Sequence, residues 1–204
     1  MKKRWGHYVL LAACCMLIVC HSSIGSAGVT YINAIWGRVP PFSLTDQQGQ
    51  SFSSDQLRGK IWIADFIFTR CAGQCPMMTM QMSRLVKAFA AEPAVRFVSI
   101  SVDPTYDTPE VLNRYARASG VPEDGRWMLL TGSHEAVWRL CHDGFRLALA
   151  DDPSNAEEPV THSVRFIVVD HKSRIRGFYD ATDAPDLSRL QRDVRRLLQD
   201  RRKE

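Results

Sequence analysis

One near-continuous apolar run, residues 61–68, constrains the fold of this chain more than any other feature. The run has the length of a β-strand, it is rich in β-branched and aromatic residues, and Asp65 interrupts it. A strand that is apolar on both sides must be covered on both faces, as at the centre of a sheet between helices. The run therefore predicts the central strand of an α/β fold, in which Asp65 needs a polar partner.

The segments around this run predict further helices and strands. Residues 40–50 contain a short alternating segment and a glycine-bearing turn, which predict a small N-terminal hairpin. Pro76 and Pro109 suit the first turn of a helix, where the N–H that proline lacks is not needed. After the central strand we expect a helix at 76–91, a strand at 95–102, a helix at 109–119, a strand at 127–130, a helix at 133–141, a hairpin at 164–179 and a helix at 186–201. This order predicts an open α/β sandwich, a central mixed sheet flanked by helices.

The N-terminus has the three-part layout of a secretory signal. Residues 2–4 are basic, residues 8–20 are apolar and residues 25–27 are small. We expect residues 1–27 to be a signal peptide or, if they are not cleaved, an N-terminal membrane anchor. Lipidation at Cys20 is a third alternative, which the bulky Val19 before it disfavours. Residues 28–39 are then a linker and residues 40–200 the folded, exported domain.

The charge of the chain gives no indication of a nucleic-acid partner. Removal of residues 1–27 takes away three cations and no acids, so the formal net charge falls from +4 to +1. The C-terminal helix carries many arginines, which we expect to form a solvated face. These arginines are Arg189, Arg192, Arg195, Arg196, Arg201 and Arg202.

The cysteines outside the leader point to the chemistry. Six cysteines are present, and Cys71, Cys75 and Cys141 lie in the predicted domain. Cys71 and Cys75 fall between the central strand and the next helix, where the partial positive charge of the helix start favours a thiolate. Two thiols at this spacing can share a disulfide or a metal, and the residues leave both open. Cys141, in an apolar helical context, is expected to be a small buried residue.

A metal at this pair needs a further ligand. His162 is the leading candidate because it lies just before the predicted strand at 164–169, and His134, His142 and His171 compete with it. Two thiolates and one imidazole suit Cu(I), and with an added donor they could hold Cu(II) or Zn(II).

Four methionines after Cys75 raise a second copper hypothesis. Met77, Met78, Met80 and Met82 carry soft thioethers that favour Cu(I). Helical spacing, however, places Met78 and Met82 on one stripe with the two cysteines, which is typical of a helix packed on a sheet. The pattern favours core packing, with an auxiliary methionine ligand as the alternative.

Four motifs in order resemble the Sco/SenC family of copper-delivery proteins. They lie at residues 66–76, 99–109, 130–132 and 161–163, and the likeness covers about residues 40–179. The resemblance implies a thioredoxin-like fold, an N-terminal anchor or export signal, and copper bound by Cys71, Cys75 and His162. It also matches the family's Asp-Pro motif to Asp103, which is either an acid near the copper site or, as the simpler account, a helix-cap or turn residue. The family usually has proline directly after the first cysteine, and Ala72 departs from this, which puts the redox poise of the site in doubt.

The resemblance further implies a copper metallochaperone rather than an enzyme. Its partners would be the copper-receiving subunit of cytochrome c oxidase and other copper chaperones or thiol reductants. The protein would be periplasmic, or anchored in the membrane through residues 5–27 and facing the periplasm. The alternative is an exported thiol–disulfide oxidoreductase in which Cys71 and Cys75 form the redox pair. A thiol peroxidase, with one activated thiolate, is a weaker third hypothesis.

Overall fold

The computed structural model describes residues 34–147, 150–151, 160–161 and 163–203. Eight strands form one sheet in the order β1-β10-β9-β4-β5-β6-β2-β3. The strands are β1 Gly37–Arg38, β2 Ser43–Asp46, β3 Ser51–Ser53, β4 Ile61–Ile67, β5 Val95–Ser101, β6 Trp127–Thr131, β9 Arg165–Val169 and β10 Arg174–Asp180. The α-helices are α1 Cys75–Ala88, α2 Pro109–Ala118, α3 His134–Arg139 and α4 Ala184–Arg201.

The apolar run forms the centre of the sheet, as predicted. All seven residues of β4 are buried. On one side β4 pairs in parallel with β5, and on the other it pairs antiparallel with β9. Because side chains alternate along a strand, Ile61 and Ile63 enter one core cluster, and Trp62 and Ala64 enter the other.

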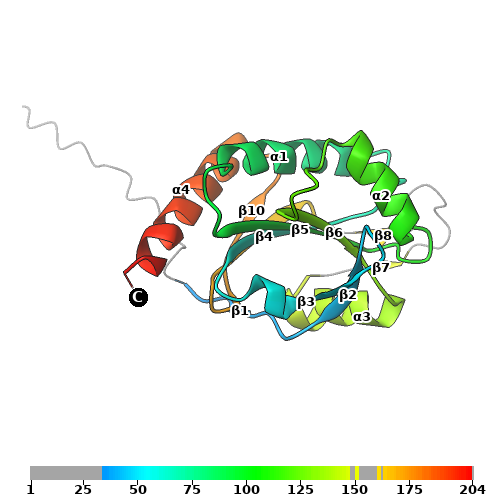
Figure 1. Ribbon diagram of the computed structural model, residues 1–204, viewed down its shortest axis with the longest axis horizontal. Coiled ribbons are helices and arrows are strands. Elements are labelled where there is room, and N and C mark those ends of the chain that lie inside the picture. Colours follow the sequence, from blue (N-terminus) through cyan, green and yellow to red (C-terminus); the bar gives the residue numbers. More distant parts are fainter. Residues whose placement is uncertain (1–33, 148–149, 152–159, 162, 204) are drawn as a thin grey trace, which may run out of the picture. The chain divides into compact units, whose positions relative to one another are not determined.

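Helices cover both faces of this sheet. Figure 1 shows α1, α2 and α4 on one side of it and α3 on the other. Buried residues of α1, α2 and α4, including Met82, Leu112 and Leu190, form one core with the facing strand residues. Val137 and Phe145, from α3 and the turn after it, lie in the second core. The predicted α/β sandwich is therefore confirmed.

The predicted N-terminal hairpin is formed by β2 and β3. Its turn needs a residue with positive φ, and Gly49 supplies it with φ 77°. The Asp46 carboxylate accepts hydrogen bonds from the backbone N–H groups of Gln48 and Gln50 and so closes the turn. The β2 strand also pairs with β6, which joins the hairpin to the main sheet.

Three short features were not expected from the sequence. Gly37–Arg38, within the stretch assigned to a linker, pair with β10, and Val39 is buried. A separate two-stranded sheet pairs β7 (Ala150–Asp151) with β8 (Val160–Thr161). The helix predicted to end at Cys141 continues beyond α3 as a π-helical turn, η3 (Leu140–Gly144).

Two outcomes concern the ends of the chain. In the part of the chain that the structure describes, no helix is both long and apolar enough to span a bilayer. The signal or anchor expected at residues 1–27 lies outside the described residues. Along α4, Arg192, Arg195 and Arg196 are exposed, in line with the solvated face expected there.

Candidate functional site

The two motif cysteines lie at the carboxyl end of the central strand. The β4 strand ends at Ile67, Cys71 lies in the following loop, and Cys75 is the first residue of α1. The Cys71 N–H donates to the Phe68 carbonyl, which closes a turn directly after the strand. Pro76 occupies the first turn of α1. The strand-to-helix setting predicted for this pair is confirmed.

The described cysteines, Cys71, Cys75 and Cys141, are all thiols. Cys71 is 8% exposed and Cys75 is 1% exposed, so the first thiol is the more accessible one. Burial raises the pKa of Cys75 well above its ordinary value; the backbone of Phe68 opposes this, whereas the Cys71 side chain and the Asp65 carboxyl add to it. The expected ease of ionisation is therefore wrong for Cys75, because loss of water outweighs the favourable helix start.

Asp65 lies on β4, on the face that α1 covers. It is fully buried, and neither carboxyl oxygen has a hydrogen-bond partner among the residues that the structure describes. Its register partner on β5 is Ser99, whose hydroxyl accepts a hydrogen bond of 2.9 Å from the Trp127 Nε1–H. Burial raises the pKa of Asp65 to about 7, and the nearby Ser99 hydroxyl partly opposes this rise. The sequence predicted a polar partner for Asp65. Ser99 is its neighbour on β5, but the two side chains form no hydrogen bond.

Two aspartates from the segment between β5 and α2 hold the cysteine-bearing loop. The Arg70 Nε–H donates to Asp103 Oδ2 at 2.8 Å, so the Asp-Pro motif lies beside the residue that precedes Cys71. Asp107 accepts three hydrogen bonds, two of them from Thr69. This contact was not predicted, because no local sequence pattern reveals a bond between residues 38 positions apart.

Of the four candidate histidines, one lies outside the described residues and three lie within them. His162, the predicted third ligand, is outside. His171 follows β9 at the end of the sheet away from the cysteines, and His142 is an exposed residue that contacts Asp143. The His134 ring stacks on Trp138. Within residues 34–147, 150–151, 160–161 and 163–203, no three His, Cys, Asp or Glu side chains form a group that could hold a metal.

Met78, Met82 and Cys141 have the packing roles that the spacing favoured. Met78 and Met82 are fully buried in the core between α1 and the sheet. Met80 is 46% exposed, on the opposite side of the helix. Cys141 is fully buried in the second core, and burial raises its pKa well above its ordinary value.

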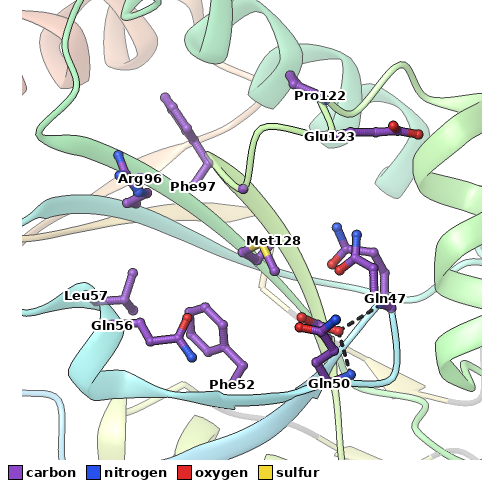
Figure 2. Close-up of a pocket in the computed structure, with 13 residues that line it drawn as sticks. Gln47, Gln50, Phe52, Gln56, Leu57, Arg96, Phe97, Pro122, Glu123 and Met128 are labelled. Carbon is purple, nitrogen blue, oxygen red and sulfur yellow. Dashed lines mark hydrogen bonds between the residues drawn. The ribbon is translucent and has the colours of Figure 1, made fainter.

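A cavity of about 380 Å³ lies away from the cysteines. Figure 2 shows its lining side chains, which include Gln47, Phe52, Arg96 and Met128. Arg96 is near the start of β5, which runs parallel to β4, whereas Cys71 follows the end of β4. The cavity is therefore separate from the cysteine site.

Several solved structures of Sco proteins have the same fold as this chain. A SCO1/SenC family lipoprotein from Bacillus anthracis has a TM-score of 0.72 and 33% identity, covering 79% of this chain and 95% of its own. BsSco, a Sco family cytochrome c oxidase assembly protein with a disulfide switch, has a TM-score of 0.71 and 32% identity, covering 81% and 96%. Bradyrhizobium japonicum ScoI with copper bound has a TM-score of 0.65 and 25% identity, covering 80% and 99%.

These matches confirm the thioredoxin-like sandwich that the resemblance implied. The sequence also matches the SCO1/SenC family over residues 37–199, which include all the elements of the main sheet and most of α4. The chain therefore belongs to the SCO1/SenC family.

Proposed function

We propose that this protein is an exported copper metallochaperone that serves the assembly of cytochrome c oxidase. It holds copper through Cys71, Cys75 and His162 and passes it to the copper-receiving subunit by exchange of ligands. The observation that carries the proposal is the neighbouring pair of thiols, Cys71 and Cys75, at the end of the central strand. It is supported by BsSco, a cytochrome c oxidase assembly protein, and by the structure of ScoI with copper bound.

The surroundings of the two thiols suit a soft metal ion. Cys71 and Cys75 belong to the same apolar cluster as Phe66 and Phe68. An apolar, nearly dry environment favours bonds from sulfur to Cu(I), because water does not compete for the metal. Transfer then requires only that ligands of the acceptor replace the sulfurs one at a time.

The direction of β9 supports His162 as the third ligand. The β9 strand runs antiparallel to β4, with Ile167 opposite Ala64 and Val169 opposite Trp62. The first residue of β9, Arg165, therefore lies near the end of β4, from which the loop to Cys71 departs. His162 precedes Arg165 by three positions in the sequence. His162 therefore precedes the end of β9 that lies nearer the cysteines, whereas His171 follows the opposite end.

Copper titration of the reduced protein tests the ligand set. We expect one copper per chain, loss of tight binding in Cys71→Ser and Cys75→Ser, and weaker binding in His162→Ala. The matched control is His142→Ala, because His142 is exposed and pairs with Asp143. Wild-type affinity in His162→Ala would remove the histidine from the ligand set. A wild-type protein that binds no copper would refute the copper function.

A second candidate function is a thiol–disulfide oxidoreductase. Adjacent thiols favour it, and BsSco has a disulfide switch. One thiolate would attack a disulfide of the partner, and the other cysteine would resolve the mixed disulfide. The partner gains two electrons and two protons, and Cys71 and Cys75 become a disulfide. Disulfide reduction that is lost in Cys71→Ser and retained in His162→Ala, with no copper binding, would favour this function.

For location we propose export, with residues 1–27 as the signal or anchor and the folded domain in the periplasm. The lipoprotein relative from Bacillus anthracis supports an anchored, exported protein. Fractionation of cells and the mass of the mature chain test this. A full-length chain in the cytosol would contradict it.

A further inference from the structure

We propose that Asp107 is a positioning residue that fixes the loop carrying Cys71. We call residues 68–74 the cysteine loop and residues 102–108 the aspartate loop. The structural part of this proposal stands on hydrogen bonds alone, and only its copper readout rests on the proposed function.

Asp107 is completely buried, and both of its carboxyl oxygens are used. Its Oδ2 accepts from the Thr69 backbone N–H at 3.1 Å and from the Ser101 hydroxyl at 2.6 Å. Its Oδ1 accepts from the Thr69 hydroxyl at 2.5 Å. A buried carboxylate is costly unless it is fully hydrogen-bonded, and here two of the three bonds hold one residue of the cysteine loop.

The position of Asp107 is not explained by the helix that follows it. The cap of α2 is Thr108, whose hydroxyl accepts a hydrogen bond from the Val111 N–H. Asp107 therefore serves a segment distant in sequence and not the start of its own helix. Its backbone N–H donates to the Asp103 carbonyl at 2.9 Å, which fixes the aspartate loop as a base for this contact.

The contact continues into the residue next to Cys71. Arg70 donates to Asp103 and stacks on the Tyr106 ring, 4.9 Å from its centroid, so both residues before Cys71 are held by the aspartate loop. The Arg70 side chain is 35% exposed, whereas Asp107 is inaccessible to solvent. Since buried, charge-assisted bonds are less weakened by water than exposed ion pairs, Asp107 is the stronger of the two anchors.

Loss of this anchor should change the position and accessibility of Cys71. In Asp107→Ala, the N–H and hydroxyl of Thr69 and the hydroxyl of Ser101 lose their acceptor and must move to find water or new partners. Thr69 is two residues from Cys71, so the cysteine loop loosens and the Cys71 thiol becomes more exposed. In Asp107→Asn, one oxygen still accepts and the amide can donate to the Thr69 hydroxyl, so the loop should stay in place.

The test measures alkylation of Cys71 by iodoacetamide in the reduced, full-length protein, followed by mass spectrometry of the peptides. We expect a rise of about tenfold in Asp107→Ala, and a rate near that of wild type in Asp107→Asn. The matched control is Asp193→Ala. Asp193 lies in α4, is also buried, and accepts a hydrogen bond from the Tyr179 hydroxyl, which lies outside the cysteine loop. An unchanged rate in Asp107→Ala, or an equal rise in Asp193→Ala, would overturn the proposal.

Copper affinity provides the second readout. If the protein binds copper, Asp107→Ala should weaken the affinity by about tenfold or more, and Asp193→Ala should not. If the wild type binds no copper, the proposed function fails, and the alkylation rates still decide the role of Asp107. If Asp107→Ala does not fold, Thr69→Val removes one donor and keeps the backbone N–H, and a smaller rise in Cys71 alkylation is expected. A Thr69→Val protein with wild-type alkylation would then count against the anchor.

Discussion

At the scale of single residues, Asp65 is a carboxyl group in an unfavourable environment. It is fully buried on the central strand without a hydrogen bond of ordinary geometry. By contrast, Asp107 is equally buried but accepts three hydrogen bonds. Burial raises the pKa of both carboxyls, but at Asp107 the hydrogen bonds from Thr69 and Ser101 oppose the rise and fix the surrounding segments.

The raised pKa of Asp65 predicts a specific dependence of stability on pH. With a folded pKa of about 7 against about 3.9 unfolded, the folded state binds the proton more tightly, so its free energy of unfolding falls as pH rises from about 4 to about 7. Asp65→Asn removes this titration. Relative to wild type, the variant should gain on the order of 2 kcal/mol between pH 5 and pH 8, measured by urea unfolding. A difference that does not vary with pH would contradict the prediction.

Met78 gives a second prediction at this scale. Because its thioether is fully buried in the core, we expect it to act through its volume and not as a copper ligand. Met78→Leu should change the free energy of unfolding by less than about 1.5 kcal/mol and leave the copper affinity unchanged. Urea unfolding and copper competition measure the two quantities. Weaker copper binding in the folded variant would instead favour the auxiliary methionine ligand, with exposed Met80→Leu as the comparison.

At the scale of elements, the hairpin of β9 and β10 is held by one carboxylate in its turn. Asp170 accepts from the backbone N–H groups of Lys172 and Arg174 and forms ion pairs with the side chains of Arg174 and Arg176. Burial alone would raise its pKa, but these hydrogen bonds outweigh burial and hold the pKa below its ordinary value. Since β9 leads from the cysteine end of the sheet into this turn, Asp170 helps to set the position of β9.

Asp170→Asn should destabilise the fold by about 3 kcal/mol at pH 7, because it leaves two partly buried guanidinium groups without their anion. The contribution of the carboxylate is present above its unfolded pKa and is lost as pH falls through its lower folded pKa, so the gap between wild type and variant should shrink in acid. Asp55→Asn, which affects an exposed pair with Arg58, should cost less than about 1 kcal/mol. Equal losses in the two variants would contradict the prediction.

The elements also show which features a sequence can predict. The longer strands and helices, such as β4, α1 and α4, were predicted to within a few residues, because burial imposes apolar runs on central strands and apolar stripes on helices. The β1 and β7 strands contain two residues each and carry no period, so neither was predicted. The same holds for the site. Its cysteines could be predicted because they belong to a local motif. The burial of Cys75 and the contact of Asp107 with Thr69 could not, because they depend on segments that meet only in the folded chain.

At the scale of the whole molecule, Cys141 reports on the stability of the domain. Cys141 is a residue of η3, and its side chain is fully buried in the second core. A thiol reagent therefore reaches it only when that core opens. In a Cys71→Ser, Cys75→Ser protein, the rate of Cys141 labelling should rise with urea in parallel with the unfolded fraction measured by circular dichroism. Labelling that is much faster than global unfolding would show instead that η3 opens locally.

The two outermost strands of the sheet have a consequence for association. The sheet ends at β1, of two residues, on one side and at β3, of three residues, on the other. Very short edge strands are one way in which natural sheets limit the addition of a strand from another chain, although β1 covers only Arg174 and Ile175 of β10. Recognition by a partner would then rest on loops and side chains more than on strand addition.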